Sequence, residues 1–566
     1  MRKIWLIAIL MSSLLAFSVK AGNPTSVPLD NPVYDFLERM ETLGFVHDVF
    51  NGIKPFDRAE VAGYLKEIAA HRNELTPIDR RKLDDFLLDF RWEMDRTKRY
   101  YLIPEGQNWY SILASWSNFK KDFRRFFQQN FPEEENHVFA WERGKDNFYF
   151  DYEQGLDYQR HSQGKTRSAS WQSFQFRGTL NENFGYHFEI SLQGMRGNDS
   201  AYIAEHPILK GSWNQLSEGE LRYSDLTGGE LAFHTKYFDF RFAQQEITWG
   251  YGESGQLILS NNTVPYPYIS VSKNWGWFKF IALHGKLQSF WADTLKDGYK
   301  VFPDKWLAAH RLELSLWHKF TIGLNESFIY GNRYADWAYL IPFNFYRAVQ
   351  HKLRDRDNAT ISIDAEYLVK NGLKVYGTIF LDEFKRSRLF TNWYGNKQAF
   401  LFGLWAVDPF HLNNFSVRFE YTAIMPWVYT HKYLINAYTS DQRSIGHWAG
   451  PNSEVIYLHV QKDWHARLRT GVKLQQYKHG NNYPNENIGG NILQGHATLL
   501  GNQEKPREIR KFLEGILTTR KTVQLYANYE IFNDFYLKGA LTFGQLKEEQ
   551  KKSNYREFFI GVVLKY

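Results

Sequence analysis

The chain has no cysteine among its 566 residues. Disulfide bonds are therefore excluded, and so is the attachment of lipid to a processed N-terminal cysteine. Long apolar runs are also scarce. Only residues 4–19 form one, and this run is shorter than the ~20 apolar residues that a membrane-spanning helix needs. Mean hydropathy is −0.51, and we expect no transmembrane helix in the mature chain.

The chain also lacks a strong charge bias and familiar catalytic motifs. Its formal net charge is +7 and it has no basic block suited to nucleic acid, so a nucleic-acid partner is not expected. Neither G-x-S-x-G nor H-E-x-x-H occurs, and the 18 His are scattered without ligand-like spacing. We therefore predict no catalytic residues, no metal site and no cofactor.

One glycine motif is present but lacks its usual context. Gly250, Gly252 and Gly255 match G-x-G-x-x-G. A dinucleotide site needs a helix after the motif and a surrounding βαβ unit, and the following residues 256–265 do not read as a helix. The glycines instead favour a tight turn or a segment that folds inward.

The N-terminus has the pattern of an export signal. A short basic start, Arg2 and Lys3, precedes the apolar run at residues 4–19, and Val19-Lys20-Ala21 is a suitable small-x-small cleavage site. We predict a signal peptide over residues 1–21.

Residues 22–100 are expected to form a small bundle of three amphipathic helices on the periplasmic side or in the mouth of a barrel. Apolar residues recur at helical spacing from Val33 onward, and Gly44 ends this first helix. Asp57 is a candidate cap for the second helix, and Thr76 followed by Pro77 begins the third. Residues 101–146 are interpreted as a connector.

From residue 147 the apolar period changes from 3.6 to 2. For example, Phe188, Ile190 and Leu192 alternate with Glu189 and Ser191. Aromatic residues make up 17% of the chain, which suits the aromatic girdles of a membrane barrel. With ~10 residues per strand, residues 147–566 suit about 16–18 strands. The predicted fold is an all-β transmembrane protein: a large antiparallel outer-membrane β-barrel with a small N-terminal α-helical bundle.

The C-terminal strand also indicates the cellular compartment. Phe558, Ile560, Val562 and Leu564 share one face with the terminal Tyr566, while the other face is mostly polar. Outer-membrane barrels commonly end in this way. The sequence thus predicts the outer membrane of a Gram-negative-type bacterium, contact with outer-membrane lipid, and recognition by the outer-membrane assembly machinery through the strand that ends at Tyr566.

Two further patterns bear on function. Alternation directs charges of both signs into the lumen, and we interpret them mainly as mutual pairs that brace the interior: Glu189, Arg311, Glu313, Asp364, Glu366, Arg418, Glu420, Arg467, Arg469, Lys473 and Glu530.

The long loops are rich in aromatic residues, which can stack on sugar rings or simply pack at the interface. We expect these loops at residues 196–217, 382–397, 425–453 and 476–519. The candidates named for sugar contact are Trp393, Tyr394, Trp427 and Trp448.

The chain resembles the Wzi-type capsule assembly family of outer-membrane proteins. The resemblance is carried by residues 34–44 with 54–58, by Trp249-Gly250-Tyr-Gly252 followed by Leu257-Ile-Leu-Ser260, and by residues 310–313, 339–342, 357–358 and 381–382. It implies a barrel of roughly 18 strands with a periplasm-side helical bundle, and a lectin-like role. It also implies candidate polysaccharide-binding residues: Trp249, Gly250, Gly252, Ser260, Arg311, Asp357 and Asp382.

Three functions are compatible with these patterns. The first is a non-enzymatic protein that attaches or assembles capsular polysaccharide or exopolysaccharide at the cell surface. The second is a porin-like diffusion channel for small solutes, although the lumenal charges show no bias of sign. The third is an outer-membrane hydrolase, for which no catalytic triad is visible.

Overall fold

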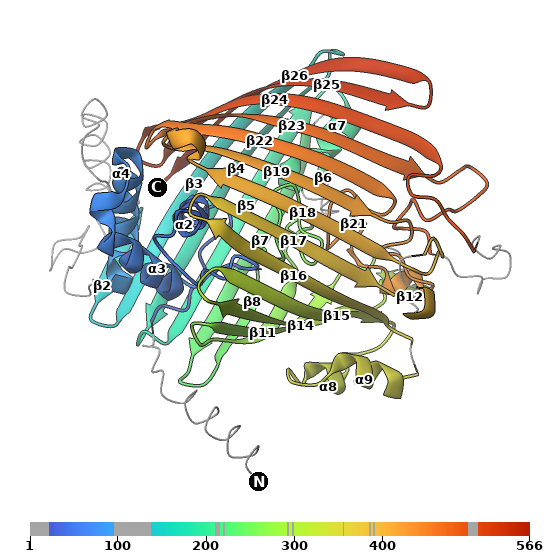
Figure 1. Cartoon of the computed structure of the whole chain (residues 1–566), viewed down its shortest axis with the longest axis horizontal. Coiled ribbons are helices and arrows are strands. Elements are labelled where there is room, and N and C mark those ends of the chain that lie inside the picture. The colour runs from blue at the N-terminus through green and yellow to red at the C-terminus, as the bar shows by residue number, and fades with distance from the viewer. Residues whose placement is uncertain are drawn as a thin grey trace, which may run out of the picture.

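The structure is a computed structural model, and it describes residues 22–94, 137–209, 216–218, 221–290, 294–296, 299–354, 356–383, 386–388, 391–495 and 508–566. The predicted signal peptide and residues 101–136 of the predicted connector lie outside these ranges. The described residues form a closed antiparallel barrel of 18 strands (Figure 1). The predicted barrel fold is confirmed.

Each barrel strand pairs with its neighbours in chain order, and β26 pairs with β3 to close the ring. The strands are β3 (Asp146–His161), β4 (Thr166–Leu180), β5 (Phe184–Gly197), β7 (Leu221–His234), β8 (Asp239–Gln244), β10 (Pro267–Asn274), β11 (Phe278–Leu287), β14 (Lys305–Leu316), β15 (Phe320–Gly331), β16 (Asn358–Lys370), β17 (Leu373–Asp382), β18 (Gln398–Val407), β19 (Phe415–Ile424), β22 (Ser453–His465), β23 (Leu468–Asn481), β24 (Ile516–Phe532), β25 (Phe535–Glu548) and β26 (Lys551–Lys565).

The two ends of the barrel differ. At one end, which we call the short-turn end, strands are joined by brief connections such as residues 181–183, 371–372 and 533–534. The C-terminus and the N-terminal helices lie at this end (Figure 1). At the other, the long-loop end, connections include residues 332–357, 425–452 and 482–515, so the last loop is shorter than the predicted 476–519 because β23 and β24 extend into it.

Side chains alternate across the barrel wall as the sequence pattern predicts. Phe188, Leu192 and Phe558 are exposed on the outer face, whereas Ser191 and Gln193 are buried on the inner face. An apolar outer face and a polar inner face suit a barrel in lipid. Among the described residues, no helix combines the length and apolar character needed to cross a membrane.

The N-terminal helices are α2 (Val33–Leu43), α3 (Arg58–Ala70), α4 (Pro77–Asp89) and α5 (Arg91–Met94), with the 3-10 turn η1 (Arg72–Glu74) between α3 and α4. They share a hydrophobic core with Leu37, Leu65 and Leu83 at its centre. Gly44, with φ +85°, ends α2 as predicted.

Two of the predicted helix caps have different outcomes. Thr76 caps α4, because its side chain accepts a hydrogen bond from the backbone N–H of Asp79. Asp57 stands at the N-cap position of α3 but makes no side-chain cap bond. Its carboxylate instead pairs with Arg241 and lies 3.5 Å from His234 on the barrel wall. The capping role expected for Asp57 is therefore wrong, since a stronger charged partner lies nearby.

Short elements occupy the remaining connections. Strand β2 (Phe139–Arg143) lies within the predicted connector and pairs with β3, and β6 (Leu216–Glu218) pairs with β7. The others are β1 (Ile53–Lys54), β9 (Thr248–Trp249), β12 (Thr294–Lys296), β13 (Tyr299–Val301), β20 (Thr439–Ser440), β21 (Arg443–Ser444), α7 (Ser200–Ala204), α8 (Trp337–Leu340), α9 (Tyr346–Lys352), η2 (Pro207–Leu209), η3 (Arg386–Arg388), η4 (Pro409–His411) and η5 (Leu434–Asn436).

Candidate functional site

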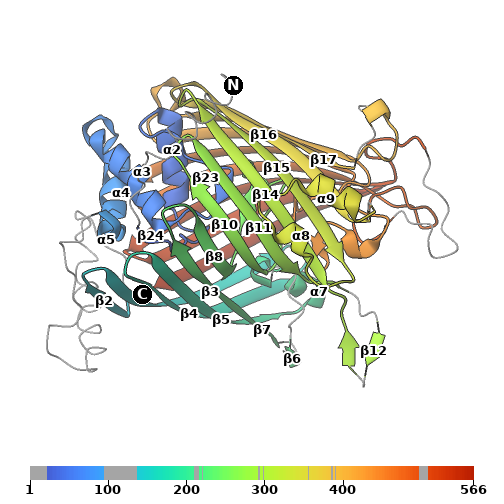
Figure 2. The ribbon, with the colours of Figure 1, turned by 90° about the horizontal axis from the view of Figure 1, so that it is seen from below.

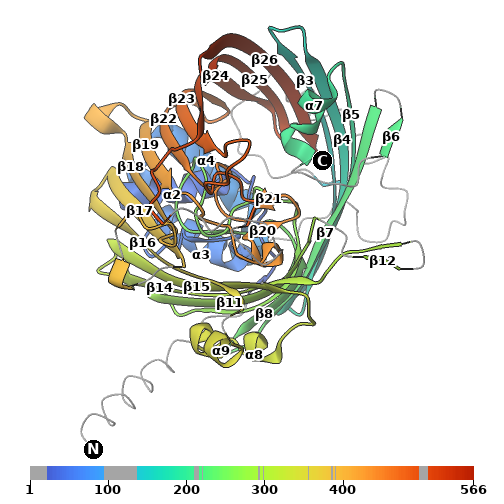
Figure 3. The ribbon, with the colours of Figure 1, turned by 90° about the vertical axis from the view of Figure 1, so that its right-hand side faces the viewer.

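The lumen is crossed by two segments that enter from opposite ends. Residues 33–54 enter from the short-turn end, and residues 245–266 fold inward from the long-loop end; together we call them the lumen plug. They meet where β1 pairs with β9, and the backbone N–H of Gly250 donates to the carbonyl of Gly52 at 2.9 Å. Figure 3, which looks into the barrel from the long-loop end, shows these segments across the lumen.

Glycines allow the inward segment to turn. Gly250, Gly252 and Gly255 have φ values of +92°, +127° and +146°, which residues with a side chain rarely adopt. A Cβ on Gly252 would lie 2.4 Å from the carbonyl oxygen of Gly255 and 2.8 Å from Leu401. The expectation of an inward-folded segment is confirmed by the backbone.

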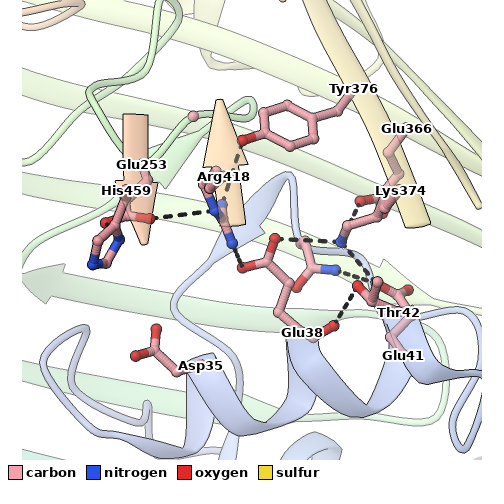
Figure 4. Close-up of polar contacts among 12 residues, drawn as sticks. Asp35, Glu38, Glu41, Thr42, Glu253, Glu366, Lys374, Tyr376, Arg418 and His459 are labelled. Carbon is pink, nitrogen blue, oxygen red and sulfur yellow. Dashed lines mark hydrogen bonds and ion pairs between the residues drawn. The ribbon is translucent and has the colours of Figure 1, made fainter. Parts of the chain in front are cut away.

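Charged side chains fasten α2 to the barrel wall (Figure 4). Arg418 Nη2 on β19 donates to Glu38 at 3.2 Å, and its Nε lies 3.3 Å from Glu253 on the plug. Lys374 Nζ on β17 lies 3.3 Å from both Glu38 and Glu41. These pairs connect a helix, a loop and two strands in one buried network.

The same network holds the second plug segment. Glu420 on β19 accepts hydrogen bonds from the backbone N–H groups of Glu253 and Ser254 at 2.7 and 2.8 Å. The hydroxyl of Tyr376 donates to the same carboxylate at 2.5 Å. His459 Nδ1 lies 2.8 Å from Glu253. Each carboxylate is thus satisfied by donors from separate elements, which fixes the path of residues 250–254.

Burial raises the pKa of both plug carboxyls, but their charged neighbours shift the two pKa values apart. Burial raises the pKa of Glu38, but Arg418 and Lys374 outweigh it and lower the pKa to about 2. Burial also raises the pKa of Glu41, and the Glu366 carboxylate raises it further, to about 8. Glu38 is therefore ionised at neutral pH, and Glu41 is a buried carboxyl that retains its proton.

Arg311 and its partners form a second buried cluster under β1. Its guanidinium donates to Asp364 at 2.7 Å and to Glu313 at 2.5 Å, and all three side chains are fully buried. A Cβ on Gly52 would lie 2.2 Å from Glu313. The prediction that lumenal charges of opposite sign pair with one another is confirmed at this cluster.

The loop of residues 425–452 covers the plug from the long-loop end. The hydroxyls of Tyr429 and Tyr438 donate to the carbonyls of Leu257 and Ile258 at 2.8 and 3.0 Å. Trp448 Nε1 donates to the carbonyl of Ser254 at 2.6 Å. Because these bonds satisfy backbone groups of the plug, the loop and the plug form one packed unit.

The structure places the remaining candidate residues in three settings. Ser260 Oγ donates to the carbonyl of Gly446 at 2.5 Å, and Trp249 and Trp427 are also buried, at 1% and 2% exposure. Asp382 accepts a hydrogen bond from the backbone N–H of Tyr429 at 2.5 Å. These four residues therefore build the plug and its cover.

Asp357 and the two loop aromatics lie elsewhere. Asp357 is paired with Arg333 at 2.7 Å and accepts a hydrogen bond from Tyr339 at 2.9 Å, so it anchors the loop of residues 332–357. Trp393 and Tyr394 are half-buried in the loop of residues 383–397. Trp393 pairs with Ile509 of a neighbouring loop.

A polar cavity of about 1150 Å³ remains between the plug and the wall made by β22–β26 and β3. Charges of both signs line it, including Asp35, Glu253, Arg467 and Lys473, together with the ring of Tyr526. Within the described residues, no group of three or more acidic or histidine side chains is arranged to hold a metal ion. The cavity is suited to hydroxyl-rich ligands that offer both donors and acceptors.

Sequence reasoning missed Glu38, Glu41, Glu253 and Lys374. Lys374 was detectable, because strand alternation places it on the same face as Tyr376 and Asp382. The helix and loop residues carry no such signal, since their inward direction depends on contacts with distant strands.

Comparison with known proteins places the chain in a family. In fold it is similar to Wzi of Escherichia coli, an outer-membrane protein involved in group 1 capsule assembly that is described as a carbohydrate-binding β-barrel. The two are 13% identical, the match covers 95% of this chain and 99% of that chain, and the TM-score is 0.55. OprD and OpdK of Pseudomonas aeruginosa match with TM-scores of 0.41 and 0.43, identities of 10% and 8%, 74% coverage of this chain, and 95% and 98% coverage of theirs.

No curated protein sequence matches this one. The family model described as "Capsule assembly protein Wzi" matches residues 146–557, which is well over half of the 566 residues. The family predicted from the sequence resemblance is thereby confirmed. The chain is an outer-membrane β-barrel that belongs to the Wzi family of capsule assembly proteins.

Proposed function

We propose that this protein holds capsular polysaccharide or exopolysaccharide at the cell surface without changing it chemically. Family membership is the observation that carries this proposal, and the related E. coli protein is described as carbohydrate-binding. The lumen plug supports the same view, because a barrel crossed by a braced plug is suited to binding more than to free diffusion.

The proposal assigns a direction to the barrel. The long-loop end faces the outside and the short-turn end with residues 22–94 faces the periplasm, since outer-membrane barrels have short periplasmic turns. The assembly machinery would then meet β26, which ends beside Tyr566 at the periplasmic end. Trp393 and Tyr394, on the loop of residues 383–397, are half-buried and offer rings for sugar stacking on the outer side.

A deletion strain tests the attachment role. Cell-bound and released polysaccharide are measured separately in the wild type, in the deletion strain and in the strain complemented with the full chain. The proposal expects unchanged total polymer with a shift from the bound to the released fraction, restored by complementation. Normal retention in the deletion strain would overturn it.

A diffusion channel is the second candidate, and the cavity of about 1150 Å³ beside the plug is the observation in its favour. Planar-bilayer recordings with the purified full chain separate the two functions. Steady conductance of the wild type would favour the channel. Silence in the wild type together with conductance after plug destabilisation would favour a closed attachment barrel.

A further inference from the structure

An unusual helical hairpin lies on the outer wall of the barrel. Residues 332–357 leave the long-loop end and place α8 and α9 against the outward faces of β11, β14 and β15, outside the ring of strands (Figures 2 and 3). Tyr339 stacks on Phe328 at 5.5 Å, and Phe343 stacks on Phe280 at 5.0 Å. The hairpin is therefore packed onto a surface that lipid covers elsewhere on the barrel.

The hairpin covers ionisable groups on the lipid-facing wall. His310 and Glu326 stand in the middle of β14 and β15 on the outward side, 3.1 Å apart. Glu326 accepts hydrogen bonds from the backbone N–H groups of Tyr346 and Arg347 at 3.0 and 2.8 Å. Charged groups at mid-strand are costly against hydrocarbon, so the hairpin must occupy the membrane at that depth.

The exposed side of the hairpin has the composition of a membrane-facing surface. Trp337, Ile341 and Phe345 are 83%, 51% and 64% exposed. Trp and Phe at this position lower the free energy of insertion into the interface. Exposure of this size would be unfavourable in water, whereas in the outer leaflet it is expected.

An apolar groove runs between the hairpin and the neighbouring strands. Its volume is about 370 Å³, within the ~300–1,000 Å³ of small-ligand sites. Phe240, Phe242 and Val271 line the barrel side, and Leu340 and Pro342 line the hairpin side. Since the groove opens on the lipid-facing wall, its ligand must come from the membrane.

The base of the hairpin is basic. His351, Lys352, Arg354 and Arg356 are all exposed where the chain returns to β16 at the long-loop end. Cationic side chains at this level attract anionic headgroups. The hairpin thus joins an apolar groove within the membrane to a basic patch near its surface.

We propose that the hairpin of residues 332–357 is a binding site for an acidic outer-leaflet lipid. One acyl chain lies in the groove beside α8, and the basic patch of Lys352, Arg354 and Arg356 selects an anionic headgroup. A phospholipid and a lipopolysaccharide share this chemistry of acyl chain and phosphate. This proposal does not rest on polysaccharide attachment, since it uses none of the residues proposed to contact sugar.

The probe is spin-labelled phosphatidylglycerol in phosphatidylcholine bilayers that contain the reconstituted full chain. Electron paramagnetic resonance measures the fraction of the label whose motion is restricted by the protein. Ala282 faces outward into the groove, so Ala282→Phe fills it. Ala527 is an exposed, outward residue of β24, so Ala527→Phe is the matched control. The expected result is that Ala282→Phe has less motionally restricted label than the wild type. Ala527→Phe should have the same amount as the wild type.

The basic patch is tested in the same bilayers. Arg354→Gln with Arg356→Gln should reduce the preference for phosphatidylglycerol over spin-labelled phosphatidylcholine several-fold, whereas Lys551→Gln with Lys552→Gln, at the same end of the barrel, should leave it unchanged. Displacement of the label by added lipopolysaccharide, or its persistence, identifies which of the two acidic lipids binds more tightly.

The depth of the hairpin in the membrane is checked independently by spin labels attached to introduced cysteines. Because the chain has no native cysteine, each label attaches at a single position. A label at Phe345→Cys should be more accessible to oxygen than to a water-soluble nickel complex, and a label at Lys547→Cys should show the reverse. Equal restriction of label in Ala282→Phe and wild type, or a water-exposed Phe345→Cys site, would overturn the proposal.

Discussion

Arg418 on β19 reaches across the lumen to Glu38 on α2, with Nη2 3.2 Å from Oε2. Both side chains are mostly buried, at 10% and 15% exposure. The contact joins residues 380 positions apart in the chain. It is one of several ion pairs that hold α2 to the barrel, together with Lys374 and Glu38 and with Arg39 and Asp408.

Replacing Glu38 should loosen the plug. The pKa of this carboxyl falls from 4.5 to about 2 in the folded protein, which corresponds to roughly 3 kcal/mol of stabilisation. That contribution is present above pH 4.5 and is lost as pH falls through the folded pKa. We expect Glu38→Gln to increase hydrogen exchange in α2 at neutral pH, and to raise single-channel conductance in planar bilayers.

The control for this variant is Glu67→Gln. Glu67 pairs with His47 on the N-terminal helical region at 3.0 Å, but both side chains are over 40% exposed, so the pair contributes little. Equal exchange in α2 for Glu38→Gln and Glu67→Gln would show that the Arg418 contact does not hold the plug.

Glu41 gives the plug an opposite response to pH. Its folded pKa, about 8, is raised above the usual 4.5 by burial and by Glu366. The stability linked to its proton is fully present below pH 4.5 and is lost as pH rises through 8. Hydrogen exchange in α2 should therefore accelerate between about pH 5 and pH 8 beyond its intrinsic pH dependence, and the extra acceleration should level off above the folded pKa. Glu41→Gln, which stays neutral, should abolish that extra acceleration, and an unaltered profile in this variant would contradict the assignment.

Local patterns in the sequence predicted much of the fold. The helix that ends at Gly44, the Thr76 cap and the alternation around Glu189 each depend on near neighbours, and the structure confirms them. The inward course of residues 245–266 was indicated only by the glycines. Its depth could not be predicted, because it is fixed by the β1–β9 pairing with a segment almost 200 residues away.

The site was predictable only in part. Inward-pointing Arg311 and Arg418 follow from strand alternation. Their partners do not, since Glu38 and Glu253 lie on a helix and a loop whose orientation is set by tertiary contact. Asp57 illustrates the same limit: a cap signal at its position is overridden by Arg241, which no local pattern brings near.

Gly252 should tolerate no side chain. Its φ of +127° and the 2.4 Å approach of a Cβ to the Gly255 carbonyl combine strain with a clash, so Gly252→Ala should lower the free energy of unfolding by roughly 3 kcal/mol. Gly276 also has a positive φ, +88°, but nothing within 4 Å, and Gly276→Ala should cost only about 1 kcal/mol. Urea unfolding in lipid vesicles measures the free energy of unfolding of both variants. An equal loss of stability in the two would contradict the predicted clash at Gly252.

The loop aromatics give the most direct test of sugar binding. If Trp393 and Tyr394 stack on the polysaccharide, then Trp393→Ala with Tyr394→Ala should weaken binding of purified capsular polymer roughly tenfold. The barrel should remain folded, because neither ring belongs to the buried core of the lumen.

The matched control is Trp464→Ala, which removes a ring that is 63% exposed near the short turn at residues 466–467. If the long-loop end faces outward, polymer cannot reach this ring, and both binding and cell-surface retention should match the wild type. Loss of binding in Trp464→Ala equal to that in the double variant would mean that aromatic removal acts through stability. Unchanged binding in the double variant would move the sugar site to the lumenal cavity, where Tyr526→Phe and Lys473→Gln are the next substitutions to measure.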